Sequence, residues 1–149
     1  MKYAVILALI LPVTAHAQGA DEFMQASRAI APNAVTDYPL VRCAALYRSI
    51  HVFAGRDVMG DGPYETAVQF EKEFGINAAL IRAQEKELGS DAAVDAVMRD
   101  IDGIAGLYGL RYQLNADATG HAFANDPMWQ SDREYCTGLF QRISDAAQE

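Results

Sequence analysis

The 149-residue sequence predicts an all-α protein, an up-down bundle of about four long helices plus a short N-terminal helix, with one inter-helix disulfide. Apolar residues recur at spacings of three and four over long stretches, which is the period of an amphipathic helix. No stretch of useful length alternates apolar and polar residues, as a half-buried strand would. Pro and Gly divide the chain into segments of helix length, and long helices joined by short or moderate loops pack antiparallel.

The N-terminal end has the layout of a secretory signal peptide. Lys2 supplies a positive charge, an apolar run of nine residues extends from Tyr3 to Leu11, and small residues stand at Ala15 and Ala17. The run is too short to span a bilayer as a helix, which takes about 20 residues. We therefore expect a signal peptide at 1–17 and a single helical domain at 18–149, soluble, in the periplasm or secreted, with no membrane insertion after cleavage.

Five helical segments are expected, at residues 21–30, 39–54, 64–88, 92–114 and from 127 onward. Asp37 or Tyr38 lies at the cap of the second segment, and Pro39 suits a first helical turn because its missing N–H would have no partner there. Gly55 is expected to end this segment. Asp126 is the expected N-cap of the last one.

The apolar stripes of these segments predict one shared core. Its expected members are Phe70, Phe74, Val97, Ile101, Ile104, Tyr108, Leu139 and Ile143. On another side of the fourth segment, Gly103, Gly106 and Gly109 recur at every third residue. Small residues there would let a neighbouring element approach closely, and they would also weaken the helix.

The two cysteines, Cys43 and Cys136, both follow the predicted signal peptide. An oxidising compartment favours their pairing, and neither belongs to a C-x-x-C motif of the kind found at metal or redox sites. We expect a disulfide that ties the first long helix to the last. Their Cα atoms should then lie within about 7 Å of each other.

The segment 115–126 has the most specific local pattern in the chain. Oxygen-bearing side chains stand at its first, third, fifth and twelfth positions, in Asn115, Asp117, Thr119 and Asp126, and Gly120 stands at the sixth. This spacing resembles the calcium loop of the EF-hand family, which implies oxygen ligands around a bound ion. The loop departs from that family by beginning with Asn and ending with Asp. Because it offers only two carboxylates and Asp126 is also a helix cap, we expect a polar loop whose calcium binding is weak at best.

His51 and His121 are the two histidines outside the predicted signal peptide. His51 lies on an apolar stripe, where a hydrogen-bonded core histidine is expected, and His121 lies in the polar loop. Either could pair with a methionine to hold a non-covalent haem, but no spacing selects one methionine. No cofactor is expected, and calcium and haem are the two alternatives.

The sequence offers no catalytic constellation. It contains neither the Gly-x-Ser-x-Gly nucleophile motif nor the His-Glu-x-x-His zinc motif. Ser49 and His51 are two residues apart, so they do not face each other on a helix. Glu71 and Glu73 flank Lys72, which favours a solvated helix face. We assign no catalytic residue and expect no enzymatic activity, although one sequence does not reveal a site assembled from distant residues.

The net charge is −8 and becomes −9 when Lys2 is removed with the predicted signal. An acidic protein repels the phosphate backbone and anionic lipid surfaces, so nucleic-acid binding is not expected. The function that remains is a non-catalytic binding or interaction module whose partner is another protein of the cell envelope. The alternative is a carrier of a small ligand or a metal, calcium or haem, that uses the bundle core or the 115–126 loop.

Overall fold

The structure is a computed structural model, and it describes the backbone of residues 14–146 and the side chains of residues 19–146. This part of the chain forms five helices, which are α1 (Thr14–Ile30), α2 (Tyr38–Met59), α3 (Asp61–Lys86), α4 (Ser90–Thr119) and α5 (Pro127–Ala146). The all-α bundle is therefore confirmed. Residues 1–13 of the predicted signal peptide lie outside the described part, and cleavage after Ala17 stays a prediction.

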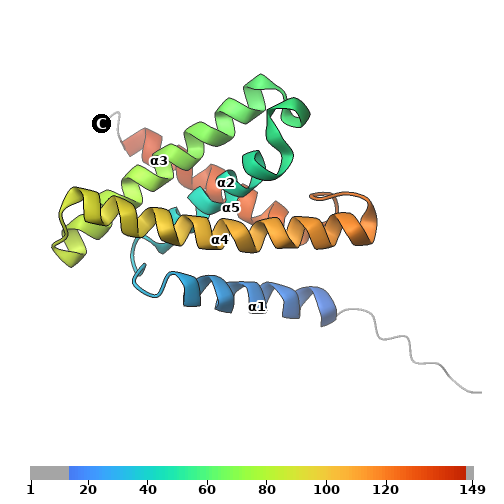
Figure 1. Ribbon diagram of the computed structural model, residues 1–149, viewed down its shortest axis with the longest axis horizontal. Coiled ribbons are helices and arrows are strands. Elements are labelled where there is room, and N and C mark those ends of the chain that lie inside the picture. The colour runs from blue at the N-terminus through green and yellow to red at the C-terminus, as the bar shows by residue number, and fades with distance from the viewer. Residues whose placement is uncertain (1–13, 147–149) are drawn as a thin grey trace, which may run out of the picture.

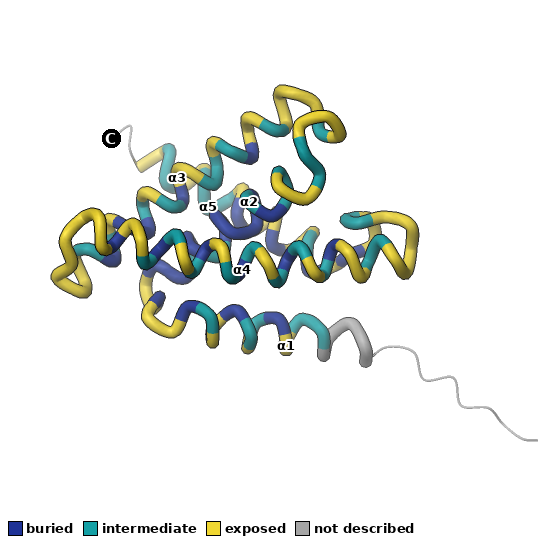
Figure 2. Tube along the Cα trace, in the orientation of Figure 1, coloured by how far each residue is buried: buried dark blue, intermediate teal, exposed yellow. Residues whose placement is uncertain are grey.

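Three helices form the centre of the bundle. α2 packs against α3 and α4, and these two also contact each other. α1 runs antiparallel to α4 along one side, while α5 packs on α2 (Figure 1). Burial follows this arrangement, because the buried stretches of each helix face its neighbours and the exposed ones face outward (Figure 2).

The predicted core is present. Five of its expected members are fully buried, namely Phe74, Val97, Ile101, Ile104 and Tyr108. The other three are half-buried and pack against them, namely Phe70, Leu139 and Ile143. The expected disulfide is also confirmed, since Cys43 on α2 and Cys136 on α5 are bonded with their Cα atoms 5.5 Å apart.

Helix boundaries differ most from the sequence-based expectation in α1, α2 and α4. α1 begins at Thr14 instead of residue 21. Gly55 leaves the helical conformation with φ at +73°, as expected, but a short helical piece continues to Met59. α4 runs on through residues expected to be loop and ends at Thr119. Polar residues at its end suggested a loop, but Gln113 donates to Asp117 one turn on, at 2.8 Å, and so supports the helix. The helix stops at Gly120, whose φ of +79° suits glycine.

Asp37 is the N-cap residue of α2, as expected, but its side chain bonds elsewhere. It precedes α2, but its side chain makes no capping hydrogen bond. The carboxylate instead accepts a hydrogen bond from Nε of Arg82 on α3 at 2.7 Å, and Arg82 also donates to Asp100 on α4 at 2.6 Å. Burial raises the pKa of Asp37, and the charge of Arg82 opposes that shift. This buried cluster connects the chain before α2 to two other helices.

A second polar cluster fixes α5 to the bundle. The hydroxyl of Tyr108 on α4 donates to Asp132 on α5 at 2.6 Å, and Arg42 on α2 also pairs with Asp132. Burial raises the pKa of Tyr108 well above its usual value, and the charge of Asp132 adds to this effect. The tyrosine therefore stays protonated and keeps its role as a donor.

Candidate functional site

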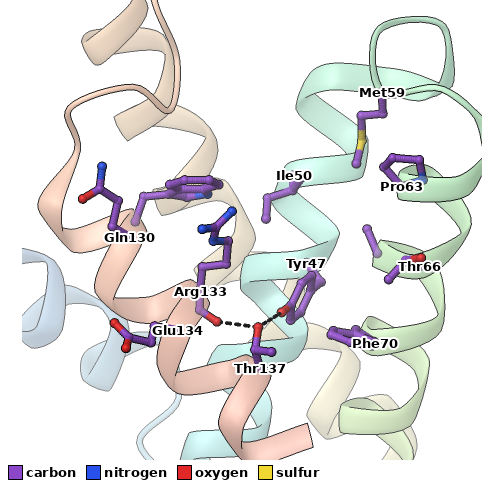
Figure 3. Close-up of a pocket in the computed structure, with 12 residues that line it drawn as sticks. Tyr47, Ile50, Met59, Pro63, Thr66, Phe70, Gln130, Arg133, Glu134 and Thr137 are labelled. Carbon is purple, nitrogen blue, oxygen red and sulfur yellow. Dashed lines mark hydrogen bonds between the residues drawn. The ribbon is translucent and has the colours of Figure 1, made fainter.

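An open groove of about 940 Å³ lies between α3 and α5, with α2 as its floor (Figure 3). We call it the α3–α5 groove. Its lining consists of Tyr47, Ile50, Met59, Pro63, Thr66, Ala67, Phe70, Trp129, Gln130, Arg133, Glu134 and Thr137. These residues come from α2 and α3, which are consecutive in the chain, and from α5, which is far from both in the sequence.

Two contacts hold the walls of the groove in place. The rings of Phe70 on α3 and Phe140 on α5 stack with their centroids 4.0 Å apart and so connect the two walls. The Cys43–Cys136 disulfide fixes α5 to the floor helix. The opposite end, near Met59 and Pro63, lies where α2 turns into α3 (Figure 3). The groove is thus formed before any ligand arrives.

The floor and the α3 wall are mainly apolar. The ring of Tyr47 meets that of Phe70 edge to face, with centroids 4.7 Å apart, and Ile50 lies one turn further along α2. The hydroxyl of Tyr47 lies 3.3 Å from that of Thr137 on α5. Burial raises the pKa of Tyr47, while the hydrogen bond with Thr137 and the charge of Arg133 act against it. Tyr47 is therefore a neutral hydrogen-bonding group at physiological pH.

The α5 wall is polar and carries one distinctive cation. The guanidinium of Arg133 lies over the Trp129 ring, 4.9 Å from its centroid, and points across the groove toward Ile50 (Figure 3). Among the described side chains it forms no ion pair. Among the other described arginines, five pair with carboxylates (Arg42, Arg48, Arg56, Arg82 and Arg111), and three, like the exposed Arg133, do not (Arg28, Arg99 and Arg142). Arg133 therefore keeps its hydrogen-bond donors available beside an apolar floor.

The four residues proposed for calcium all have partners within the protein. The side-chain amide of Asn115 donates to the carbonyl oxygens of residues 121, 122 and 124, and so closes the turn after α4. Thr119 donates to the carbonyl oxygen of Asn115, and Asp117 accepts from a glutamine on its own helix. Within the described part of the chain, no three His, Cys, Asp or Glu side chains form a group that could hold a metal ion.

Asp126 caps α5, as its position before Pro127 predicted. Its carboxylate accepts hydrogen bonds from the backbone N–H groups of Met128 and Trp129, and from Arg111. Burial acts to raise the pKa of Asp126, but these hydrogen bonds outweigh it and hold the pKa below its usual value. The carboxylate of Asp126 therefore has its hydrogen-bond partners within the protein.

His51 belongs to a charged cluster on α2 and α3. Its Nε2 lies 2.5 Å from Oε2 of Glu71, and the other oxygen of Glu71 accepts a hydrogen bond from Arg48 at 2.9 Å. Glu71 is half-buried, so the expectation that it lies on a solvated face was wrong. Arg48, which donates the hydrogen bond to the half-buried Glu71, is 23 residues away from it in the sequence. His121 is exposed in the loop, as expected.

No pattern in the sequence predicted the α3–α5 groove. The sequence contains no local signal that α3 and α5 leave a gap above α2, because that gap depends on how the three helices pack.

Comparison of the chain with family models, with curated proteins and with solved structures finds no match. None of the helices in the described residues is long and apolar enough to pass through a membrane.

Proposed function

We propose that this protein is an exported, non-catalytic binding module, and that the α3–α5 groove receives part of another protein of the cell envelope. The observation that carries the proposal is the groove itself, an open apolar floor between two fixed helical walls. A rigid site loses little conformational entropy when it binds, so less of the free energy gained by burying its apolar surface is offset by ordering the site.

The chemistry of the lining favours binding over catalysis. Arg133 and Glu134 are the two charged residues in the lining, and they are adjacent in sequence, so their side chains point in different directions on the helix. Tyr47 is held neutral by burial. A floor of apolar groups with a few polar groups at the wall is the usual composition of a binding site.

Carriage of a small ligand is a second candidate, favoured by the size of the groove. Its α5 wall extends from Trp129 to Thr137, which is a little more than two helical turns or about 12 Å. Its volume of about 940 Å³ falls within the range of about 300 to 1,000 Å³ that is common for small-molecule sites. The core beneath is filled by buried side chains, so a ligand would occupy the groove.

Site-specific photo-cross-linking in intact cells tests the proposal. A photoreactive residue at Thr66, on the α3 wall, should give a discrete cross-linked product with an envelope protein. The control places the same residue at Asp95, which is exposed on α4 outside the groove and should give none. The product from Thr66 should disappear when Ile50→Glu puts a charge on the floor. Cross-links of equal yield from both positions, or none from Thr66, would contradict the proposal.

A further inference from the structure

We propose that the protein forms a two-fold symmetric dimer, in which α3 of each copy packs into a shallow depression between α3 and α4 of the other. This depression lies outside the α3–α5 groove, so the inference goes beyond the proposed function and does not depend on it. The exposed apolar residues of this surface, its shape and its charges each support the dimer.

Exposed apolar side chains are concentrated on the hairpin that α3 and α4 form at one end of the bundle (Figure 1). Eleven large apolar side chains are exposed in the described part of the chain, and four of them lie on these two helices near their connection or within it, namely Ile76, Leu80, Leu88 and Val94. Ile76 and Leu80 are one helical turn apart, so together they form an apolar ridge on α3. Exposed apolar residues that lie together mark an interaction surface.

A depression of about 210 Å³ lies beside this ridge. It contains Gly75, which has no side chain to fill the space between the two helices. A cavity of about 150 Å³ holds a group as large as benzene, so the depression has room for one large apolar side chain. Its lining is mainly apolar and consists of Glu71, Lys72, Gly75, Ile76, Val94, Val97 and Met98.

The surface is complementary to itself. In a two-fold symmetric contact both copies use the same patch, so that patch must offer a projection and a recess. The α3 ridge is the projection, and the depression beside it is the recess. When the two-fold axis runs parallel to α3, between the ridge and the depression, each ridge enters the depression of the other copy. Ridges of one helix packed into the grooves of another are the usual contact between helices.

The charges beside the depression match in the same arrangement. Lys72 lies on its α3 side and forms no ion pair among the described side chains. Arg48 pairs with both Glu71 and Asp102, so Lys72 on α3 and Asp102 on α4 lie at the same end of the hairpin. The side chain of Asp102 is 66 % exposed. An axis parallel to α3 keeps both copies running in the same direction, and Lys72 of each copy therefore meets Asp102 of the other.

Sedimentation equilibrium of the exported protein measures the dimer. Each copy is acidic and the two repel each other at long range, so we expect a dissociation constant in the micromolar range and a dimer at about 100 μM. Leu80→Glu puts a charge on the ridge and should give a monomer. Leu110→Glu is the matched control, because Leu110 is also 59 % exposed but lies outside the patch, and this variant should remain a dimer.

Exchanging two charges tests the arrangement of the copies. Lys72→Glu and Asp102→Lys each replace two attractive contacts of the dimer by repulsive ones, so each variant alone should dimerise about tenfold more weakly or worse. In a mixed dimer of the two variants, both contacts again join a lysine to a carboxylate. An equimolar mixture should therefore form mixed dimers, which native mass spectrometry detects. Both residues are exposed, so circular dichroism should show an unchanged helix content.

A wild type that is monomeric at about 100 μM would overturn the dimer. A dimer that survives Leu80→Glu, or one that Leu110→Glu dissociates, would overturn the contact through the α3 ridge. A mixture that forms no mixed dimer would overturn the two-fold arrangement.

Photo-cross-linking separates a second copy from other occupants. Asp95 lies next to Val94 at this surface, so a photoreactive residue there should give a product of twice the mass of the chain. A product with a different protein instead would overturn the dimer in favour of a mixed complex. The product from Thr66 still decides the proposed function, because Thr66 lines the α3–α5 groove and not the depression.

Discussion

Gly103 on α4 lies against Ile30 at the end of α1, and replacing it tests how tightly the two helices pack there. A Cβ atom built on Gly103 would lie 2.6 Å from Cγ2 of Ile30, the last residue of α1. That methyl group is attached directly to a branched Cβ, so it has little freedom to move away. By contrast, Gly106 on the same helix has no atom within 4 Å of the corresponding position.

The magnitudes follow from two opposing effects. Replacing glycine by alanine inside a helix stabilises it by about 0.5 to 1 kcal/mol, and Gly106→Ala should show this gain in full. At Gly103 the same helix stabilisation is opposed by a steric clash with Ile30, because overpacking costs about 1 to 3 kcal/mol. Gly103→Ala should therefore be less stable than Gly106→Ala by about 1 to 3 kcal/mol.

Urea unfolding followed by far-UV circular dichroism, with the disulfide intact, measures both variants against the wild type. Shortening Ile30 to alanine should make Gly103→Ala much less harmful, because it removes the clashing methyl group. The reasoning would be refuted if Gly103→Ala stabilised the protein as much as Gly106→Ala. It would also be refuted if the effects of Ile30→Ala and Gly103→Ala were simply additive.

Four further predictions concern the free energy of unfolding, which measures each of them. Reduction of the disulfide, which closes a loop of 93 residues, should cost about 4 to 5 kcal/mol, and an unchanged stability would contradict this. Asp37→Asn should cost less than the about 3 to 5 kcal/mol of a fully broken buried pair because Arg82 keeps its ion pair with Asp100, whereas Arg82→Met, which leaves both carboxylates without their partner, should cost more. The lowered pKa of Asp126 means that its contribution is complete above the unfolded value of 3.8 and is lost as the pH falls through the folded value. The stability difference between the wild type and Asp126→Asn should therefore shrink on acidification, and a constant difference would argue against it. Ile101→Ala, at a fully buried position, should cost about 2 to 5 kcal/mol, and a loss below about 0.5 kcal/mol would mean that the side chain is not packed.

The sequence by itself determined the features that depend on neighbouring residues. Helical periodicity identified the helices, since residues three and four apart share a face whatever the rest of the chain does. The cap of α5 at Asp126 was predictable for the same reason, because its partners are the next backbone N–H groups. The disulfide followed from there being two cysteines to pair.

Only the tertiary structure decided the features that join distant segments. Asp37 was expected at the cap of α2. Its carboxylate makes no capping hydrogen bond and instead pairs with the buried guanidinium of Arg82. Glu71 was expected to face solvent, but Arg48 and His51 enclose it. The α3–α5 groove likewise depends on how α3 and α5, which stack Phe70 on Phe140, are placed on either side of α2. Such contacts depend on the angles at which helices cross, and those angles follow from the packing of all the side chains together.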